Sequence, residues 1–280
     1  VRAAVAAQAA RARALGATVV GAGVVAPGVI DVPAGVVRYA SNLGWHHVPL
    51  RELVLDAVDA PVGVGHDAGT AGIAEGVFGA ARGLRHYVHV SIGTGIAASL
   101  VVSGHAVTGS VGGAGELGHI PIHPGGEPCP CGQRGCLEAY ASGAGLARRY
   151  RRLTGRQATA RDLVDRQDRD AVARRVWSEG IEALALGLTT CTLLLDPEAV
   201  VLGGGLALAG DKLAAPLRAS VRSNLTWRQP PAVDLTRLGT DGATIGAALL
   251  AMRAAGREGE ATRWAVSDGI QGSTGGARHR

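Results

Sequence analysis

The sequence predicts an α/β fold, because segments typical of buried strands alternate with segments of helical period along most of the chain. Its 280 residues suffice for one large domain or two smaller ones, and 47% of them are apolar, enough for a sizeable core. Aromatic residues make up only 3%, so that core must be built from Ala, Val, Leu and Ile. The 43 glycines show no collagen-like period.

The first half of the chain mixes predicted helices and strands. Helical period is found over 1–15, in LRELVLDAV and in AGTAGIAEGVFGAARG. Strand patterns are found in TVVGAGVVAPG, VVRYA and PVGVG. The pair YVHVSI and IAASLVV is separated by GTG, which predicts two strands joined as a hairpin.

The second half of the chain is mostly helical. Helices are predicted in LEAYAS, GAGLARRYRRL, TARDLVDRQ with Thr159 as N-cap, 170–195, DKLAAPLRASVRSNL, and DGATIGAALLAMRAA with Asp241 as cap. The segments AVVLGGG and VDLTRLG are predicted strands. The residues from 256 to 280 are polar and glycine-rich, which predicts a disordered tail.

The charge pattern and the apolar pattern exclude some classes of function. The net charge of +5 is compatible with nucleic-acid binding, but the arginines form no basic stripe, so a nucleic-acid partner is not expected. No stretch reaches about 18 uncharged apolar residues, so no membrane span is expected. The N-terminus lacks the continuous apolar run of a signal peptide, so the expected location is cytoplasmic. In that reducing setting, clustered cysteines bind metal more often than they form disulfides.

A cluster of cysteines lies in the middle of the chain. One imidazole and three thiols come from His119, Cys129, Cys131 and Cys136. This donor set predicts a closed, tetrahedral structural zinc site, and the glycines between the cysteines allow a tight loop. A redox pair or unconnected thiols are the alternatives. The fourth cysteine, Cys191, lies in an apolar helix and is expected in the core.

The order GGAGELGH followed by CPCGQRGCLE resembles the signature of the ROK family of bacterial sugar kinases and sugar-responsive repressors. The resemblance runs from about Gly21 to Ala255. It implies an actin-like (ribonuclease H-like), two-lobed sugar kinase fold in which the zinc loop orders the sugar pocket. Residues 1–66 would form a small lobe, to which the helix 241–255 returns. Residues 67–240 would form the large lobe that carries the zinc loop.

The same resemblance implies sugar ligands around the zinc site: Glu116, His119, which would also bind zinc, and Glu138. A carboxylate forms strong, charge-assisted hydrogen bonds with hydroxyl groups. Each glutamate taken alone is more commonly a surface residue. Gly28 in APGVID and Asn42 in ASNLGW resemble further sugar-facing positions of the family.

The segment VGVGHDAGTAG resembles the part of the family that carries the catalytic base, which implies that role for Asp67. The alternative for this residue is a helix N-cap, a common use of aspartate after a strand. The residue before it is His66, where the family usually has asparagine. His66 is expected to contact the sugar, and this departure leaves the identity of the sugar open.

Two glycine clusters resemble the nucleotide-binding motifs of the family, which implies ATP with Mg²⁺ as cofactor. Gly93, Thr94 and Gly95 in SIGTG would meet the phosphates. Gly203, Gly204 and Gly205 in VLGGGLA would lie against adenosine. Either cluster alone is more often an ordinary turn.

The actin-like fold normally opens with a strand-turn-strand carrying Asp-x-Gly-x-Thr, and no such segment precedes Val1. A truncated chain with an incomplete small lobe is therefore expected. Whether the chain is catalytically active in this form stays an open question of the sequence. Three functions remain: an ATP-dependent kinase that acts on a hexose or N-acetylhexosamine, at the 6-hydroxyl; the sugar-sensing half of a repressor; or a truncated, non-catalytic protein that binds sugar and zinc. The family resemblance also implies a homo-oligomer.

Overall fold

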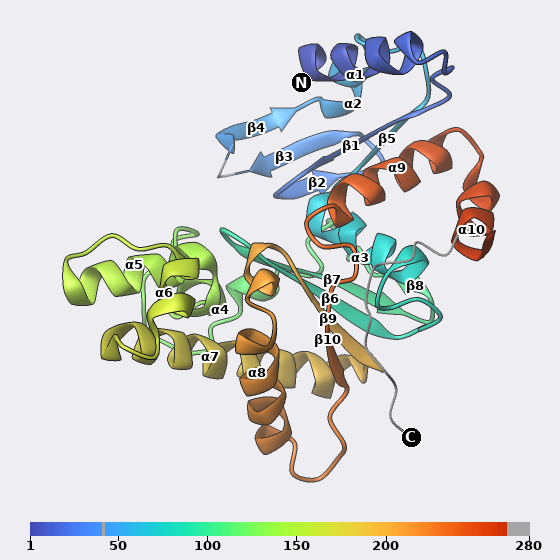
Figure 1. Ribbon diagram of the computed structural model, residues 1–280. Helices are drawn as coiled ribbons and strands as arrows, with labels where there is room; N and C mark the ends of the chain where they lie inside the picture. Colours follow the sequence, from blue (N-terminus) through green and yellow to red (C-terminus); the bar gives the residue numbers. More distant parts are fainter. Residues whose placement is uncertain (41–42, 268–280) are drawn as a thin grey trace.

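The computed structural model describes residues 1–40 and 43–267, and Figure 1 shows it as two parts, one above the other. The upper part is formed by the first 66 residues. Its elements are α1 (Arg2–Ala14), β1 (Ala22–Ala26), β2 (Val29–Asp31), β3 (Val36–Ala40), β4 (Trp45–Val48), α2 (Leu50–Leu55) and β5 (Val62–His66). Strand β1 pairs in parallel with β5, and β2, β3 and β4 form a separate antiparallel sheet.

The lower part is built on a mixed sheet that, within the described residues, has five strands in the order β10-β9-β6-β7-β8. These strands are β6 (Tyr87–Ile92), β7 (Ile96–Val102), β8 (His105–Ala106), β9 (Ala199–Gly203) and β10 (Ala232–Leu235). The predicted hairpin is confirmed, because β6 and β7 pair antiparallel. Strands β9 and β10 follow in parallel, β9 against β6 and β10 against β9.

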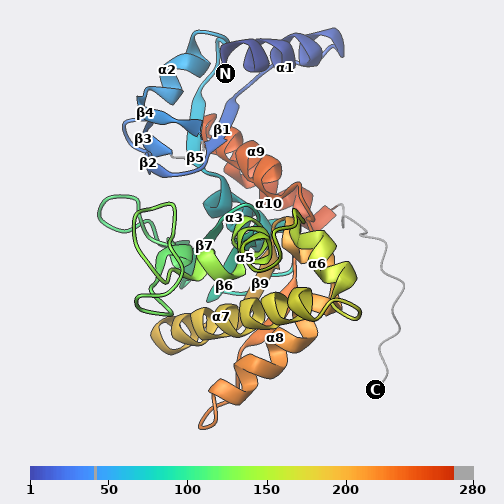
Figure 2. The same cartoon turned by 90° about the vertical axis from the view of Figure 1, so that its left-hand side faces the viewer.

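Helices cover both faces of this sheet (Figure 2). The helices that follow the first 66 residues are α3 (Asp67–Phe78), the short 3-10 helix η2 (Leu117–His119), α4 (Leu137–Ala141), α5 (Gly143–Thr154), α6 (Ala160–Arg166), α7 (Ala171–Leu195), the 3-10 helix η3 (Gly205–Ala209), α8 (Asp211–Asn224), α9 (Gly242–Ala254) and α10 (Glu258–Ser267). Because both faces are covered, every residue of β9 is buried, as the continuous apolar run AVVLG requires.

Helix α7 belongs to the largest of three apolar clusters in the described residues. That cluster gathers buried residues between Val88 and Val233, a second gathers residues between Ala9 and Val64, and a small third one gathers residues between Ala81 and Val201. Within the described residues, α7 alone is long and apolar enough to cross a membrane, judged by length and composition. Half of that stretch is buried, and α7 packs on α4, α5, α6 and α8, as a core helix does.

Helix α9 connects the two parts, since it packs on β1 and β5 above it and on α3 below it (Figures 1 and 2). The backbones approach so closely that side chains are excluded. A Cβ on Gly23 would lie 1.7 Å from the carbonyl oxygen of Ala247, and a Cβ on Gly246 would lie 2.4 Å from that of Thr70. Glycine is therefore required at these contacts, because no space is left for a side chain.

A buried carboxylate fastens α3 to the segment that leads into α9. Glu75 is 1% exposed. Its Oε2 accepts a hydrogen bond from the N–H of Ala80 at 2.6 Å. Its Oε1 accepts one from the hydroxyl of Thr236 and one from the N–H of Leu238 at 3.3 Å. The carboxylate thus satisfies the donors of two segments that are far apart in the sequence.

Several local predictions differ from the structure. The strands β2, β4 and β8 were not predicted, because runs of two to four residues carry too little pattern. The prediction of disorder from residue 256 is wrong for Glu258–Ser267, which form α10 and pack on α9 and α3; residues 268–280 lie outside the described part. Asp241 stands at the N-cap of α9 without a side-chain cap bond, because its backbone is helical rather than extended. The cap by Thr159 is confirmed.

The close packing of α9 predicts the effect of a single methyl group. Gly246→Ala should lower the free energy of unfolding by about 1–3 kcal/mol, the usual cost of an overpacked contact, measured by urea unfolding. Gly259→Ala in α10 is the matched control, because a Cβ there meets nothing within 4 Å. Equal stability of the two variants would contradict the close approach of α9 to α3.

A buried histidine gives the fold a pH dependence. His89 on β6 is 3% exposed, and burial lowers its pKa to about 4, against an ordinary value of 6.5. Within the described residues, its Nδ1 has no hydrogen-bond partner. Below pH 6.5 the imidazole of His89 is protonated in the unfolded chain, whereas in the folded chain it is protonated only when the pH falls to about 4. Stability present above pH 6.5 is therefore lost as the pH falls to 4.

The predicted size of this loss is about 3 kcal/mol, at about 1.4 kcal/mol for each unit of pKa. His89→Gln should flatten the decline of unfolding free energy between pH 6.5 and 4.5, measured by urea unfolding at a series of pH values. His105→Gln, at an exposed position of β8, should keep the wild-type slope. A wild-type slope in the His89 variant would show that another group causes the decline.

Candidate functional site

The four residues predicted to hold zinc gather in one place. His119 ends η2, and the three cysteines lie in the loop that leads to α4. One ligand atom from each of the four lies within 4.8 Å of all the others. The Nδ1 of His119 is 3.8 Å from the Sγ of Cys129, and the Sγ of Cys131 is 3.7 Å from that of Cys136.

The donor set fits a zinc ion. Zn–S bonds of about 2.3 Å in a tetrahedron place the sulfur atoms about 3.8 Å apart, close to the separations in the cluster. Burial raises the pKa of Cys136 to about 12, and the neighbouring thiols Cys131 and Cys129 contribute further. Three adjacent thiolates would repel one another, so a cation among them would favour ionisation of the set.

Ion pairs also hold the loop that carries these ligands against α5. The sequence pattern did not predict these pairs. Arg152 donates two hydrogen bonds to the carboxylate of Glu127, one of them 2.5 Å long. Arg149, whose side chain is 7% exposed, lies 3.8 Å from the same carboxylate. The N–H of Glu127 donates to the hydroxyl of Tyr140 at 2.8 Å. The sequence feature that could have indicated these ion pairs is the presence of two arginines three residues apart on one predicted helix.

Two of the predicted sugar ligands stand at the open side of the zinc cluster. The Nε2 of His119 and the Oε2 of Glu116 are 3.8 Å apart, beyond hydrogen-bond range. Their side chains are 34% and 38% exposed. The imidazole nitrogen that faces away from the cysteines and a carboxylate are therefore both available to a hydroxyl group.

The third predicted sugar ligand contacts a different part of the site. Glu138 lies in the first turn of α4, two residues after Cys136. Its Oε2 accepts a hydrogen bond from the N–H of Ile96 at 2.9 Å, directly after the turn between β6 and β7. A Cβ on Gly95 would lie 2.5 Å from the same oxygen, so glycine is needed for the turn to pass this carboxylate.

That turn is the predicted phosphate-binding segment. Gly93 donates its N–H to the carbonyl of Gly95 at 2.9 Å, and it accepts a hydrogen bond from the N–H of Gly143 at 2.8 Å. A Cβ on Gly93 would meet nothing within 4 Å, and Thr94 is exposed. Hydrogen bonds with Gly95 and Gly143 hold the turn in place. Among the described residues, the backbone at Gly93 has no close neighbour on its open side, so a ligand can approach it there.

The second glycine cluster begins with the last residue of β9, and its three members differ. A Cβ on Gly203 would lie 2.4 Å from the Nε2 of His89, and a Cβ on Gly204, where φ is +78°, would lie 2.5 Å from the carbonyl oxygen of Ile92. Both glycines are thus required by packing. A Cβ on Gly205 would meet nothing within 4 Å, so only this position has an open face.

The predicted base begins a helix at the end of a buried strand. Asp67 is the first residue of α3, its side chain is 41% exposed, and its Oδ1 accepts a hydrogen bond from the N–H of Ala68 at 2.6 Å. His66, and not Asp67, is the N-cap, because its Nδ1 accepts from the N–H of Gly69 at 3.2 Å. In neutral His66 the proton then resides on Nε2, which can donate to a ligand.

The other two predicted sugar-facing positions receive less support. Gly28 has φ of +94°, and a Cβ there would lie 2.2 Å from the carbonyl oxygen of Tyr39, so glycine is needed for the turn into β2. Asn42 lies outside the described residues.

The structure connects these groups to different degrees. Glu138 joins the zinc loop directly to the turn at Gly93–Gly95. Helix α3, which presents Asp67, packs on β6 and β7, the strands that flank this turn. The contact of Gly143 with the turn was not predicted, because a glycine at a helix start indicates a turn and does not identify what it touches.

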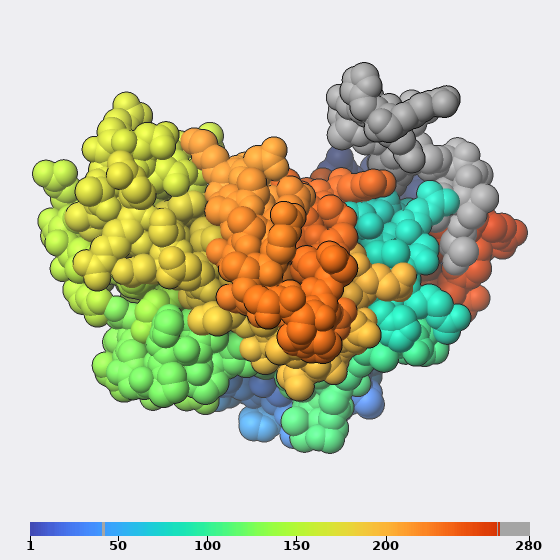
Figure 3. Space-filling view, turned by 90° about the horizontal axis from the view of Figure 1, so that it is seen from below, coloured from blue at the N-terminus to red at the C-terminus, as the bar shows by residue number. Residues whose placement is uncertain are grey.

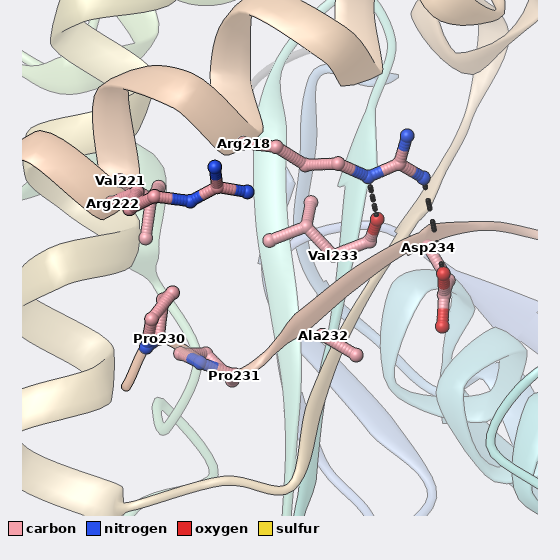
Figure 4. Close-up of a pocket in the computed structure, with 8 residues that line it drawn as sticks. All are labelled: Arg218, Val221, Arg222, Pro230, Pro231, Ala232, Val233 and Asp234. Atoms are coloured by element: carbon pink, nitrogen blue, oxygen red, sulfur yellow. Dashed lines mark hydrogen bonds and ion pairs between the residues drawn. The ribbon is translucent and has the colours of Figure 1, made fainter. Parts of the chain in front are cut away.

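A separate hollow of about 310 Å³ lies between α8 and β10 (Figure 4). None of the predicted site residues lines it. Arg218 at its rim donates to the carbonyl of Val233 at 2.7 Å and pairs with Asp234 at 3.9 Å. The neighbouring residues of α8, coloured orange, cover the middle of the face seen from below in Figure 3. The hollow therefore belongs to the outer surface of the sheet edge.

Comparison with known proteins identifies the family of this chain. The model of the ROK family matches residues 1–254. A glucokinase of Thermotoga maritima is 36% identical over 208 residues, which are 69% of this chain and 66% of that protein. A putative xylose repressor of a Caldicellulosiruptor species is 29% identical over 75% of this chain and 57% of the repressor.

A solved structure gives the same assignment for the fold. A ROK family glucokinase of Streptomyces griseus, in complex with glucose and AMPPNP, has a TM-score of 0.79 and 30% identity, covering 89% of this chain and 87% of that one. The prediction of an α/β, actin-like fold is confirmed. The chain belongs to the ROK family of proteins.

Proposed function

We propose that this protein transfers the γ-phosphoryl group of ATP to a hexose or N-acetylhexosamine, at the 6-hydroxyl. The observation that carries the proposal is the contact of Glu138, a predicted sugar ligand beside the metal cluster, with the backbone of the predicted phosphate turn at Ile96. A sugar site and a phosphate site held by one side chain are what a sugar kinase needs, because phosphoryl transfer depends on positioning. The match to glucokinases adds support.

Asp67 is the proposed general base. One of its oxygens is engaged by the N–H of Ala68. The other oxygen would take the proton of the sugar hydroxyl, while that hydroxyl oxygen bonds to the γ-phosphorus and the bond from phosphorus to ADP breaks. A positioned base of this kind contributes about 10²–10⁴-fold to the rate. ATP would bring Mg²⁺, which neutralises the charge on the phosphates.

The proposed sugar ligands differ in chemistry. Glu116 and Glu138 would accept hydrogen bonds from hydroxyl groups, and the Nε2 of His66 would donate one. Such a site rejects analogues that lack a hydroxyl, because its acceptors would be left unpaired. We place the sugar between the lobe of residues 1–66 and the lobe of residues 67–240. The phosphates would lie against the open face of Gly93, and adenosine against the open face of Gly205.

Zinc is the proposed resident metal. His119, Cys129, Cys131 and Cys136 would hold it in a closed site, where it supplies a cross-link to the loop rather than a reactive position. Because His119 offers zinc its Nδ1, the metal would also fix the direction in which its Nε2 faces the sugar. We further propose a cytoplasmic protein, and the family resemblance implies a homo-oligomer.

A second candidate function is sugar sensing without phosphoryl transfer, favoured by the similarity to the xylose repressor. A sensor needs the sugar ligands but neither a base nor an open phosphate turn. The exposed carboxylate of Asp67 and the open backbone face of Gly93 favour the kinase. Glucose binding without any ATP turnover by the wild-type protein would reverse this order.

The test of the base is Asp67→Asn. The amide oxygen can still accept the hydrogen bond from Ala68, so the start of α3 should be kept. We expect glucose-dependent release of ADP from Mg²⁺-ATP to fall by about 10²–10⁴-fold, while glucose binding by calorimetry stays within about twofold. Asp59→Asn, at an exposed position, should turn over at the wild-type rate. Full turnover by the Asp67 variant would remove this residue from the role of base.

The test of the metal is elemental analysis. The purified protein should contain one zinc ion per chain, and Cys136→Ser should lose most of it, because a hydroxyl is a much weaker zinc ligand than a thiolate. Cys191→Ala is the matched control, since this cysteine is buried in α7, away from the cluster, and burial raises its pKa to about 11. Equal zinc content in both variants would overturn the assigned ligand set.

A further inference from the structure

We infer that the metal cluster positions the phosphate turn as well as the sugar ligands, with Glu138 and Gly143 as the positioning residues. The inference rests on the proposed function, because it concerns how this protein binds ATP. It assigns two jobs to Glu138: one oxygen holds the turn and the other remains for the sugar. It also assigns a role to Gly143, which lies in neither the zinc loop nor the predicted nucleotide motifs.

The connection runs through the eight residues from Cys136 to Gly143. Cys136 is a member of the metal cluster and is also the N-cap of α4. Glu138 follows in the first turn of this helix. The helix ends at Ser142, which caps α5 by accepting a hydrogen bond from the N–H of Gly145 at 3.0 Å. The metal cluster therefore stands at one end of this segment, and the contacts with the turn stand at its middle and its other end.

The segment is rigid because the core encloses it. Cys136, Leu137 and Ser142 are 0% exposed. Leu137 donates its N–H to the carbonyl of Ile120 at 3.0 Å, which ties α4 to the residue after His119. Packing at this density leaves little room for side chains to take up a movement. A displacement of Cys136 is therefore passed along the helix rather than absorbed.

Two contacts pass the position of α4 to the phosphate turn. The Oε2 of Glu138 accepts from the N–H of Ile96 at 2.9 Å, on one side of the turn. The N–H of Gly143 donates to the carbonyl of Gly93 at 2.8 Å, on the other side. A Cβ on Gly143 would lie 2.9 Å from that carbonyl oxygen, so the contact tolerates no side chain. Both ends of the turn are thus held by one helical segment.

This arrangement predicts that damage to the segment weakens nucleotide binding even when no sugar is present. The probe is AMPPNP with Mg²⁺, titrated into the sugar-free protein by calorimetry, and glucose is titrated separately. Gly143→Ala should bind AMPPNP at least about fivefold more weakly, which is the effect of losing one well-formed hydrogen bond. Its zinc content should be unchanged. Gly259→Ala should bind AMPPNP as the wild type does.

Glu138 is tested with a pair of variants that separates its two jobs. In Glu138→Gln the amide oxygen can still accept the bond from Ile96, so AMPPNP should bind within about twofold of the wild type. Glucose should bind at least about tenfold more weakly, because a charge-assisted bond is lost. In Glu138→Ala both bonds are lost, so both ligands should bind more weakly. A residue that only contacts sugar would leave AMPPNP binding unchanged in both variants.

Removal of the metal provides an independent perturbation. Protein stripped with a chelator should bind AMPPNP at least about fivefold more weakly, and one equivalent of Zn²⁺ should restore the affinity. The inference is overturned if the wild type binds AMPPNP and the stripped protein, Gly143→Ala and Glu138→Ala all bind it equally well. Failure of the wild type itself to bind AMPPNP overturns the proposed kinase function, and the inference with it.

Discussion

The close approach of α9 to the strands above it and the helix below it is the constraint on which the architecture depends. Two lobes built from separate stretches of chain need a connection, and here one helix supplies it by backbone contact. At Gly23 and Gly246 the partner oxygens occupy the space where a side chain would begin. The hydrogen bonds that Thr236 and Leu238 donate to Glu75 then fix the segment that precedes α9.

The candidate site follows from this frame, because most of its groups stand where a strand or an α-helix begins or ends. Asp67 begins α3, directly after a buried strand. Gly93 follows β6, and Gly205 follows β9, at the same end of two parallel strands. The irregular zinc loop brings Glu116 and His119 to the site, although no strand or α-helix carries them. The ion pairs of Glu127 with α5 attach this loop to the rest of the fold, while the cluster of His119 and the three cysteines brings its own residues together.

Much of this organisation could be predicted from the sequence, and what could not has physical causes. The strand runs at β6, β7 and β9 are long and buried, so their apolar pattern was sufficient. The four residues of the cluster could be predicted because imidazole and thiolate are both ligands that zinc prefers. Contacts such as Glu138 with Ile96, or Gly143 with Gly93, join a residue to a backbone atom more than 40 positions away. Backbone atoms are the same at every residue, so such partners leave no pattern to detect.

The three glycines at the end of β9, Gly203 to Gly205, differ in what they indicate about packing and about function. A relative of this chain that had given up nucleotide binding would still need glycine where His89 and the Ile92 carbonyl press on the backbone, at positions 203 and 204. Only positions with an unobstructed face, Gly93 and Gly205, would be free to acquire side chains. Under the proposed function, the residues at these two open positions would therefore distinguish a relative that binds nucleotide from one in which only the packing role of the glycines remains.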